Sequence, residues 1–199
     1  MYKVFVNDKP LFLTNKVEKE TDFQLFLLES VDIEQLIIKM YQNKIQKANL
    51  YFPDEKAILK KLKEKIPVVK AGGGLVYNQK GEVLFIKRNG KWDLPKGGKD
   101  KGEKMQETAM REVEEETGVN GLIVTKKLQK TYHVFQRNGK YKLKVTHWFE
   151  MKTNFKGKTN PQKEEGIKKA VWLNQEEIKE AMNNSYENIK LLFVEENML

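Results

Sequence analysis

Short runs of apolar residues that alternate with polar ones predict β-strands near the start of the chain. Residues 2–6 and 11–13 have this pattern and are separated by the polar turn 7–10. Residues 22–27 indicate a third strand, and residues 49–52 a fourth. We therefore expect a sheet of short strands in this part of the chain.

Two segments between and after these strands have the three-to-four-residue spacing of amphipathic helices. Asp32 is placed to cap a helix that ends near Gln42, and Pro53 and Asp54 open a second helix. The apolar faces of these helices would consist of Ile33, Leu36, Ile37 and Met40 in the first, and of Ile58, Leu59, Leu62 and Ile66 in the second. Few residues here suggest chemistry, so packing or dimerisation is the simplest role for residues 1–66.

The rest of the chain predicts a larger sheet with helices. Asn138 and Gly139 lie between two apolar runs, the strongest local signal for a β-hairpin. The expected strands cover residues 68–77, 83–86, 122–135, 141–151 and 170–173, and the expected helices cover residues 103–117 and the segment from Gln175 onward. We divide the chain after Ile66 into a small N-terminal α/β domain, 1–66, and a second domain, 67–199.

Composition narrows the classes of protein. Cys is absent, which excludes disulfides, a thiolate nucleophile and zinc sites with sulfur ligands. Residues 1–13 lack the apolar core of a signal peptide, and no run approaches the roughly 18 apolar residues of a membrane span. We expect a cytoplasmic protein that does not contact a membrane. The net charge of +9 suits an anionic partner, although Lys-rich surfaces also serve solubility, so nucleotide phosphates, nucleic acid and no partner at all stay open.

The segment most informative about chemistry is a glycine-containing loop that leads into a helix with three carboxylates on one face. Glu112, Glu115 and Glu116 are spaced i, i+3 and i+4, an arrangement in which like charges repel by a few tenths of a kcal/mol per pair. A hard divalent cation such as Mg²⁺ would offset that repulsion, because it prefers oxygen ligands. Gly97 and Gly98 allow the backbone to approach a ligand closely.

Residues 97–119 resemble the signature of the Nudix hydrolases at every fixed position. The matching residues are Gly97, Glu103, Arg111, Glu112, Val113, Glu115, Glu116, Gly118 and Val119. The resemblance covers roughly residues 68–199 and implies an αβα sandwich with a mixed sheet, here preceded by the small α/β unit. It also implies that water attacks phosphorus in a nucleoside diphosphate linked to another group, with Mg²⁺ as cofactor and Mn²⁺ as a substitute.

The resemblance also implies roles for individual residues. Gly97, Glu112, Glu115 and Glu116 are expected metal ligands, Arg111 is expected to orient Glu112, and Glu103 is expected to support the site. The general base would be Glu112, or a carboxylate of a later loop, for which Glu164 and Glu165 are the candidates. We favour Glu112.

The substrate is narrowed by further similarity to the branch that contains diadenosine tetraphosphate and diphosphoinositol polyphosphate hydrolases. Residues 94–97, 132–133 and 141–149 carry this similarity. The expected substrate-binding residues are Arg88, Lys96, Tyr132, His133 and Lys144. Two departures from the branch are Asp100, which stands where Glu is usual, and Phe135, which lies where many of these enzymes carry a Tyr.

Diadenosine tetraphosphate is therefore the substrate that the sequence favours, and several alternatives stay open. They are nucleoside triphosphates including 8-oxo-dGTP, ADP-ribose, nucleotide sugars, diphosphoinositol phosphates and the 5′ end of RNA. A Nudix protein that binds nucleotide or nucleic acid without catalysis is a further alternative, although such relatives typically lose a carboxylate or the Arg of the signature. Members of the family are often dimers, so a homodimer is compatible with the sequence.

Overall fold

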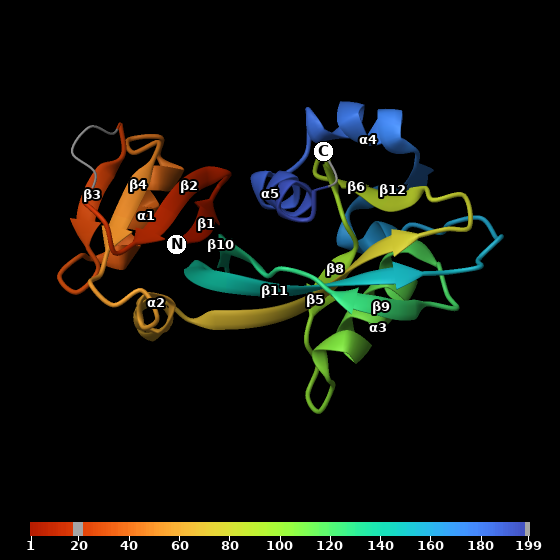
Figure 1. The fold of residues 1–199 in the computed structure, drawn as a ribbon, viewed down its shortest axis with the longest axis horizontal. Helices are drawn as coiled ribbons and strands as arrows, with labels where there is room; N and C mark the ends of the chain where they lie inside the picture. The colour runs from red at the N-terminus through yellow and green to blue at the C-terminus, as the bar shows by residue number, and fades with distance from the viewer. Residues whose placement is uncertain (18–21, 198–199) are drawn as a thin grey trace. The chain divides into compact units, whose positions relative to one another are not determined.

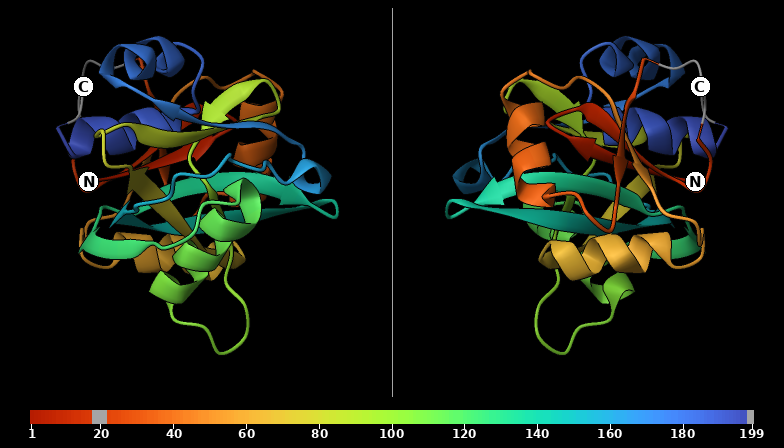
Figure 2. Two further views of the ribbon diagram at one scale, coloured as in Figure 1. Left: turned by 90° about the vertical axis from the view of Figure 1, so that its right-hand side faces the viewer. Right: turned by 90° about the vertical axis from the view of Figure 1, so that its left-hand side faces the viewer.

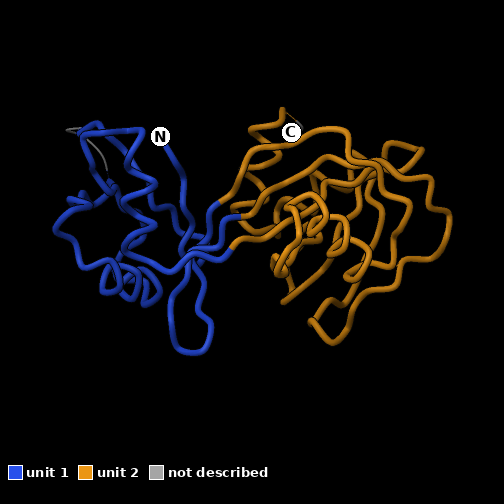
Figure 3. Tube along the Cα trace, turned by 90° about the horizontal axis from the view of Figure 1, so that it is seen from below, with its two compact units in different colours: residues 1–69, 132–145 blue, residues 70–131, 146–199 orange. Residues whose placement is uncertain are grey.

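The computed structural model describes residues 1–17 and 22–197, which form two compact units (Figures 1 and 3). Unit 1 consists of residues 1–69 and 132–145, and unit 2 consists of residues 70–131 and 146–199. Unit 1 thus includes residues 132–145, which the sequence division places in the second domain. Strand pairing explains the difference, because Val4 and Val6 pair in parallel with Tyr132 and Val134.

Unit 1 is a sheet with two helices. Its elements are β1 (Tyr2–Val6), β2 (Lys9–Thr14), β3 (Gln24–Leu27), α1 (Ile33–Tyr41), β4 (Ala48–Tyr51), α2 (Ile58–Lys65), β10 (Thr131–Arg137) and residues 140–145 of β11 (Lys140–Lys152). The strand order is β11-β10-β1-β2-β4-β3. β1 and β2 form an antiparallel hairpin, whereas β10 with β1, β2 with β4, and β3 with β4 are parallel pairs.

Both helices of unit 1 pack on the same face of this sheet. Their buried residues join a single apolar core with the inward residues of the strands, among them Val4, Leu11 and Leu50. Asp32 caps α1, as expected, since its side chain accepts a hydrogen bond from the Gln35 amide. α2 begins at Ile58, later than we expected, because the Asp54 carboxylate accepts backbone amides in a separate turn.

Unit 2 is an α/β/α sandwich. Its elements are β5 (Val68–Tyr77), β6 (Val83–Arg88), β7 (Lys91–Asp93), β8 (Lys96–Gly98), α3 (Met105–Thr117), β9 (Ile123–Lys127), residues 146–152 of β11, the 3₁₀ helix η1 (Lys163–Glu165), β12 (Ile167–Leu173), α4 (Gln175–Met182) and α5 (Glu187–Glu195). The strand order is β12-β6-β5-β11, with β7 beside β6, β8 beside β5 and β9 beside β11. α3 covers one face of the sheet and α4 and α5 cover the other (Figure 2, left), as the expected fold class requires.

The glycines of β5 allow α3 to lie directly on the sheet. A Cβ added at Gly72 would come within 2.7 Å of the Ala109 amide nitrogen, and one at Gly74 within 2.6 Å of a Val113 methyl carbon. Contacts this short exclude any side chain at these positions without movement of the helix. The helix that carries the carboxylates is therefore held against the sheet at a spacing that only glycine permits.

The structure corrects three expected elements and confirms the hairpin. Residues 122–135 are two strands, because β9 pairs with β11 and β10 also pairs with β1, and the residues between them, 128–130, are in no strand. The expected C-terminal helix is two helices, and α3 begins at Met105. Asn138 and Gly139 have φ of +52° and +73°, which confirms the tight turn.

None of the described helices combines the length and the apolar character that a membrane-spanning helix requires.

Candidate active site

β8 brings the glycine loop beside the helix of the carboxylates. Gly97 and Gly98 pair with Gly72 and Ala71 of β5, the strand on which α3 packs. The first turn of α3 is capped, because the Lys104 amide donates to the Glu107 carboxylate at 2.8 Å. The loop and the helix are thus anchored to the same strand, which fixes where their side chains meet.

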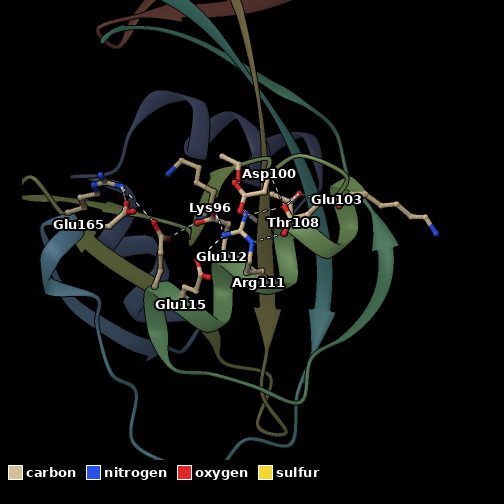
Figure 4. A network of polar contacts seen from close by, with 12 residues as sticks. Lys96, Asp100, Glu103, Thr108, Arg111, Glu112, Glu115 and Glu165 are labelled. Carbon is tan, nitrogen blue, oxygen red and sulfur yellow. Dashed lines mark hydrogen bonds and ion pairs between the residues drawn. The ribbon is translucent and has the colours of Figure 1, made fainter. Parts of the chain in front are cut away.

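Arg111 is the centre of the polar network on α3 (Figure 4). Its guanidinium donates to Glu103 at 2.7 and 3.1 Å, to Glu112 at 2.9 Å, and to Glu115 at 2.8 Å. It also donates to the Gly98 carbonyl oxygen at 2.9 Å. Only the planar, five-donor fork of Arg can serve this many acceptors at once. Arg111 therefore bonds to Glu112, the loop and two further carboxylates at the same time.

Glu103 is tied to the network from outside the helix. It accepts from Arg111 and from the Thr108 hydroxyl at 2.8 Å, and these bonds lower the pKa of Glu103 to about 2. Because the pKa of Glu103 is lowered only in the folded state, its hydrogen bonds stabilise the fold above pH 4.5. This stabilisation is lost as the pH falls towards 2. Thr108 was not among the residues that we expected, because a Thr within a helix carries no distinctive signal.

Glu112 lies against the glycine loop. A Cβ added at Gly97 would overlap its carboxylate, at 1.9 Å from Oε2. Burial raises the pKa of Glu112, with Arg111 opposing the rise and the nearby Glu115 and Glu165 adding to it. Glycine at position 97 therefore leaves room for the Glu112 side chain. In the metal-free site, the raised pKa also makes this carboxylate a better proton acceptor.

Glu116 is the most deeply buried carboxylate of the site, with a relative exposure of 1%. Burial raises the pKa of Glu116 to about 7, although Lys96 and Arg88 lower it. Its Oε2 accepts the Lys96 amide at 2.9 Å, whereas its Oε1 has no hydrogen-bond partner within the described structure. The nearest cation to Oε1 is Arg88, at 3.7 Å. A buried carboxylate oxygen left in this state favours a positively charged ligand.

Two of the expected substrate-binding residues join this network through ion pairs. Arg88 lies 3.4 Å from Glu165 of η1, so Glu165, and not Glu164, is the later carboxylate that the fold connects to the site. Lys96 forms a buried ion pair with Asp93 and also bonds to the Leu94 carbonyl oxygen. Asp93 was missed from the sequence, because a single Asp at the end of a short strand has no pattern to mark it.

The remaining expected substrate residues belong to unit 1. Tyr132 is buried in the core of that unit and packs edge-on against Tyr2, with ring centroids 5.9 Å apart. Its ring is thus used in packing within unit 1, and its expected role in substrate binding stays a prediction. Lys144 lies over the Phe135 ring at 4.8 Å, and His133 is half-buried on the neighbouring strand.

The residues of the site fit a divalent cation. An oxygen of Glu116 is buried without a hydrogen bond, and Glu112 and Glu115 lie one helical turn or less away on the same helix. In the described ranges, no three acidic or His side chains already surround a common point, because Arg111 holds Glu112 and Glu115. An ion would therefore share these carboxylates with Arg111.

The class of fold is an α/β/α sandwich whose carboxylate-bearing helix faces a glycine loop, and comparison with known proteins identifies the family. The family model named NUDIX domain matches residues 68–193, which is more than half of the chain. The chain belongs to the NUDIX domain family. The match begins with β5 and leaves residues 1–67 outside it.

Among curated proteins, the chain is similar to RNA pyrophosphohydrolases. It is 33% identical over 91 residues to the one of Wolbachia pipientis wMel, covering 40% of this chain and 56% of that protein. It is 35% identical over 92 residues to the one of Erythrobacter litoralis, covering 39% of this chain and 56% of that protein. The chain thus spans little more than half the length of these relatives.

Solved structures share the fold. The MutT protein of Methanosarcina mazei superposes with a TM-score of 0.54 at 23% identity, over 67% of this chain and 94% of that one. A C. elegans Ap4A hydrolase complex superposes with a TM-score of 0.50 at 22% identity, over 65% of this chain and 96% of that one. These likenesses establish the sandwich architecture.

Replacing Arg111 tests its role as the centre of the network. Arg111→Lys keeps the charge but loses the fork, so the three carboxylates repel one another with fewer bonds between them. We expect the free energy of unfolding to fall by about 1–3 kcal/mol. Urea denaturation followed by circular dichroism measures the change, and an unaltered midpoint would contradict the assignment.

The overlap at position 97 supplies a matched pair of glycine variants. Gly97→Ala should displace Glu112 and lower the free energy of unfolding by about 1–3 kcal/mol. Gly98→Ala, at a position with no atom within 4 Å of the added carbon, should change it by less than about 0.5 kcal/mol. Thermal melts of both variants make the comparison, and equal shifts would be inconsistent with the close contact.

The buried Glu116 should make stability depend on pH. Its pKa near 7 exceeds the value of about 4.5 in the unfolded chain, so the folded state binds more protons between these values. The free energy of unfolding should therefore fall as the pH rises from 4.5 through 7, by up to about 3 kcal/mol.

Glu116→Gln should remove this dependence in metal-free protein. We expect the variant to be more stable than the wild type at pH 8 and similar to it at pH 4.5. Urea midpoints measured in the presence of EDTA at both pH values provide the test. Parallel pH profiles for the two proteins would show that Glu116 is not the titrating group.

Proposed function

We propose that this chain is a Mg²⁺-dependent pyrophosphohydrolase that acts on the 5′-polyphosphate of a nucleotide. The observation that carries the proposal is the site on α3, where Arg111, Glu112, Glu115 and Glu116 meet the Gly97 loop. A Nudix protein that only binds its ligand would not need all of these groups, and the chain retains each of them.

The residues of the site have different roles in the proposed reaction. Glu112, Glu115, Glu116 and the Gly97 carbonyl would hold the cation, which supplies charge to neutralise phosphate oxygens and to acidify a bound water. Glu112 accepts the proton of the attacking water, because it lies against the glycine loop beside the other carboxylates. Arg111 keeps Glu112 in place, and Arg88 offers a guanidinium to a phosphate oxygen.

The 5′-triphosphate end of RNA is the substrate that we favour. The curated relatives with about one-third identity are RNA pyrophosphohydrolases, which supports this choice. Tyr132 is one of the residues on which the similarity to diadenosine tetraphosphate hydrolases rests. It is buried in the core of unit 1, which weakens the argument for that substrate. Diadenosine tetraphosphate stays as the second candidate, since both substrates present a chain of phosphates on a nucleoside.

A hydrolysis screen tests the proposal and ranks the substrates. It compares 5′-triphosphorylated RNA, diadenosine tetraphosphate, 8-oxo-dGTP, ADP-ribose, nucleotide sugars and diphosphoinositol phosphates at one concentration with Mg²⁺. Selective release of pyrophosphate or phosphate from the RNA supports the favoured substrate, whereas selective cleavage of diadenosine tetraphosphate replaces it. Turnover of none of them would overturn the proposal.

Glu115→Gln connects the activity to the site. Because Glu115 is about half exposed and Gln can still accept from Arg111, the fold should remain stable. Loss of one negative ligand should lower kcat by about two orders of magnitude or more. Glu114→Gln, an exposed neighbour on the same helix, should leave kcat unchanged. Comparable activity in both variants would remove Glu115 from the site.

A further inference from the structure

One face of the unit 1 sheet carries no helix of that unit. Both α1 and α2 pack on the opposite face, where every second strand residue enters the apolar core. The alternate residues therefore point to the face without helices. They are Lys142 and Lys144 of β11, His133 and Phe135 of β10, Lys3 and Phe5 of β1, Pro10 and Phe12 of β2, Asn49 and Tyr51 of β4, and Leu25 and Leu27 of β3. We refer to these residues as the open face.

Basic and aromatic side chains are interleaved on the open face. The Lys144 amine lies 4.8 Å from the centre of the Phe135 ring, and the Lys3 amine lies 5.8 Å from that of Phe12. Phe12 in turn packs against Phe23, with ring centroids 5.0 Å apart. Phe12 and Phe135 are half-buried, whereas Phe5 is nearly covered. The lysines are thus held over rings that remain partly accessible.

The charge of this face has one sign. The strand segments of unit 1, residues 2–6, 9–14, 24–27, 48–51, 132–137 and 140–145, contain no Asp or Glu. Asp22, which precedes β3, is paired with Lys47. A sheet surface that combines lysines with accessible rings is complementary to phosphates separated by flat bases.

We propose that the open face of unit 1 binds single-stranded RNA. The lysines would contact phosphates, and the rings of Phe12 and Phe135 would stack on unpaired bases, which a duplex does not offer. The choice of RNA over DNA rests on the proposed function, whereas the preference for a single strand rests on the charge and the rings. The part of this surface on β1 to β4 precedes the NUDIX match, whereas His133, Phe135, Lys142 and Lys144 fall within the matched residues 68–193.

The test is binding of a labelled single-stranded RNA of about 12 nucleotides with a 5′-hydroxyl end, measured by fluorescence anisotropy in EDTA. This RNA has no 5′-polyphosphate and no metal is present, so hydrolysis does not contribute. Glu115→Gln should bind it as the wild type does. Binding can therefore succeed or fail independently of the proposed hydrolysis.

Two lysines of the open face provide the charge test. Lys3→Gln combined with Lys142→Gln removes two phosphate contacts, so affinity at 0.1 M salt should fall by up to about 25-fold. The slope of log affinity against log salt should decrease by about 1.4. The matched control, Lys56→Gln with Lys60→Gln, changes the net charge equally at exposed positions in and before α2 and should bind RNA almost normally.

A stacking variant keeps the proposal falsifiable if the lysine variant folds poorly. Phe135→Leu should weaken binding by about 5-fold or more at unchanged melting temperature, because the base loses its ring partner. No binding by the wild type, or equal losses in the lysine variant and its control, would overturn the proposal. Equal affinity for single-stranded DNA would overturn the choice of RNA.

A second copy of the chain is the competing occupant. If the wild type sediments as a dimer and the variants of the open face sediment as monomers, the face is a contact between copies and the proposal fails. A single species that does not change between wild type and variants supports the RNA surface.

Discussion

The candidate site depends on one guanidinium that bonds to three carboxylates at once. Glu103, Glu112 and Glu115 all bond to Arg111, and the same side chain reaches the Gly98 carbonyl. Without a cation between them, carboxylates at this spacing repel one another and would turn towards solvent. The Arg therefore keeps negative charge concentrated on one helix face, which is the condition for binding a divalent cation there.

The position of that helix follows from a second constraint, the absence of side chains on β5. Gly72 and Gly74 let α3 approach until any added methyl group would collide with it. Gly97 does the same for Glu112 on the loop side. Three glycines thus determine how close the helix, the sheet and the loop lie, and Arg111 joins what they bring together. The same few residues therefore determine both the packing and the electrostatics of the site.

Much of this arrangement could be predicted from the sequence, because it is local. The cap of α1, the Asn138-Gly139 turn and the helix of Glu112, Glu115 and Glu116 depend on residues a few positions apart. The burial of Tyr132 depends on pairing between strands more than 100 residues apart, as does that of Val134, and no local pattern encodes that pairing. Asp93 was missed although it lies only three residues before Lys96, because the burial that makes their ion pair important comes from the fold.

The order of strands in unit 1 also has a consequence for synthesis of the chain. Its core includes Leu143 and Val145, and β1 needs β10 as a neighbour. The first 69 residues therefore leave the ribosome without the strands that complete their sheet, while domains that are continuous in sequence can fold as they emerge. Unit 1 cannot close until residue 145 has been translated, so its apolar strands stay uncovered for longer than those of a contiguous domain of the same size.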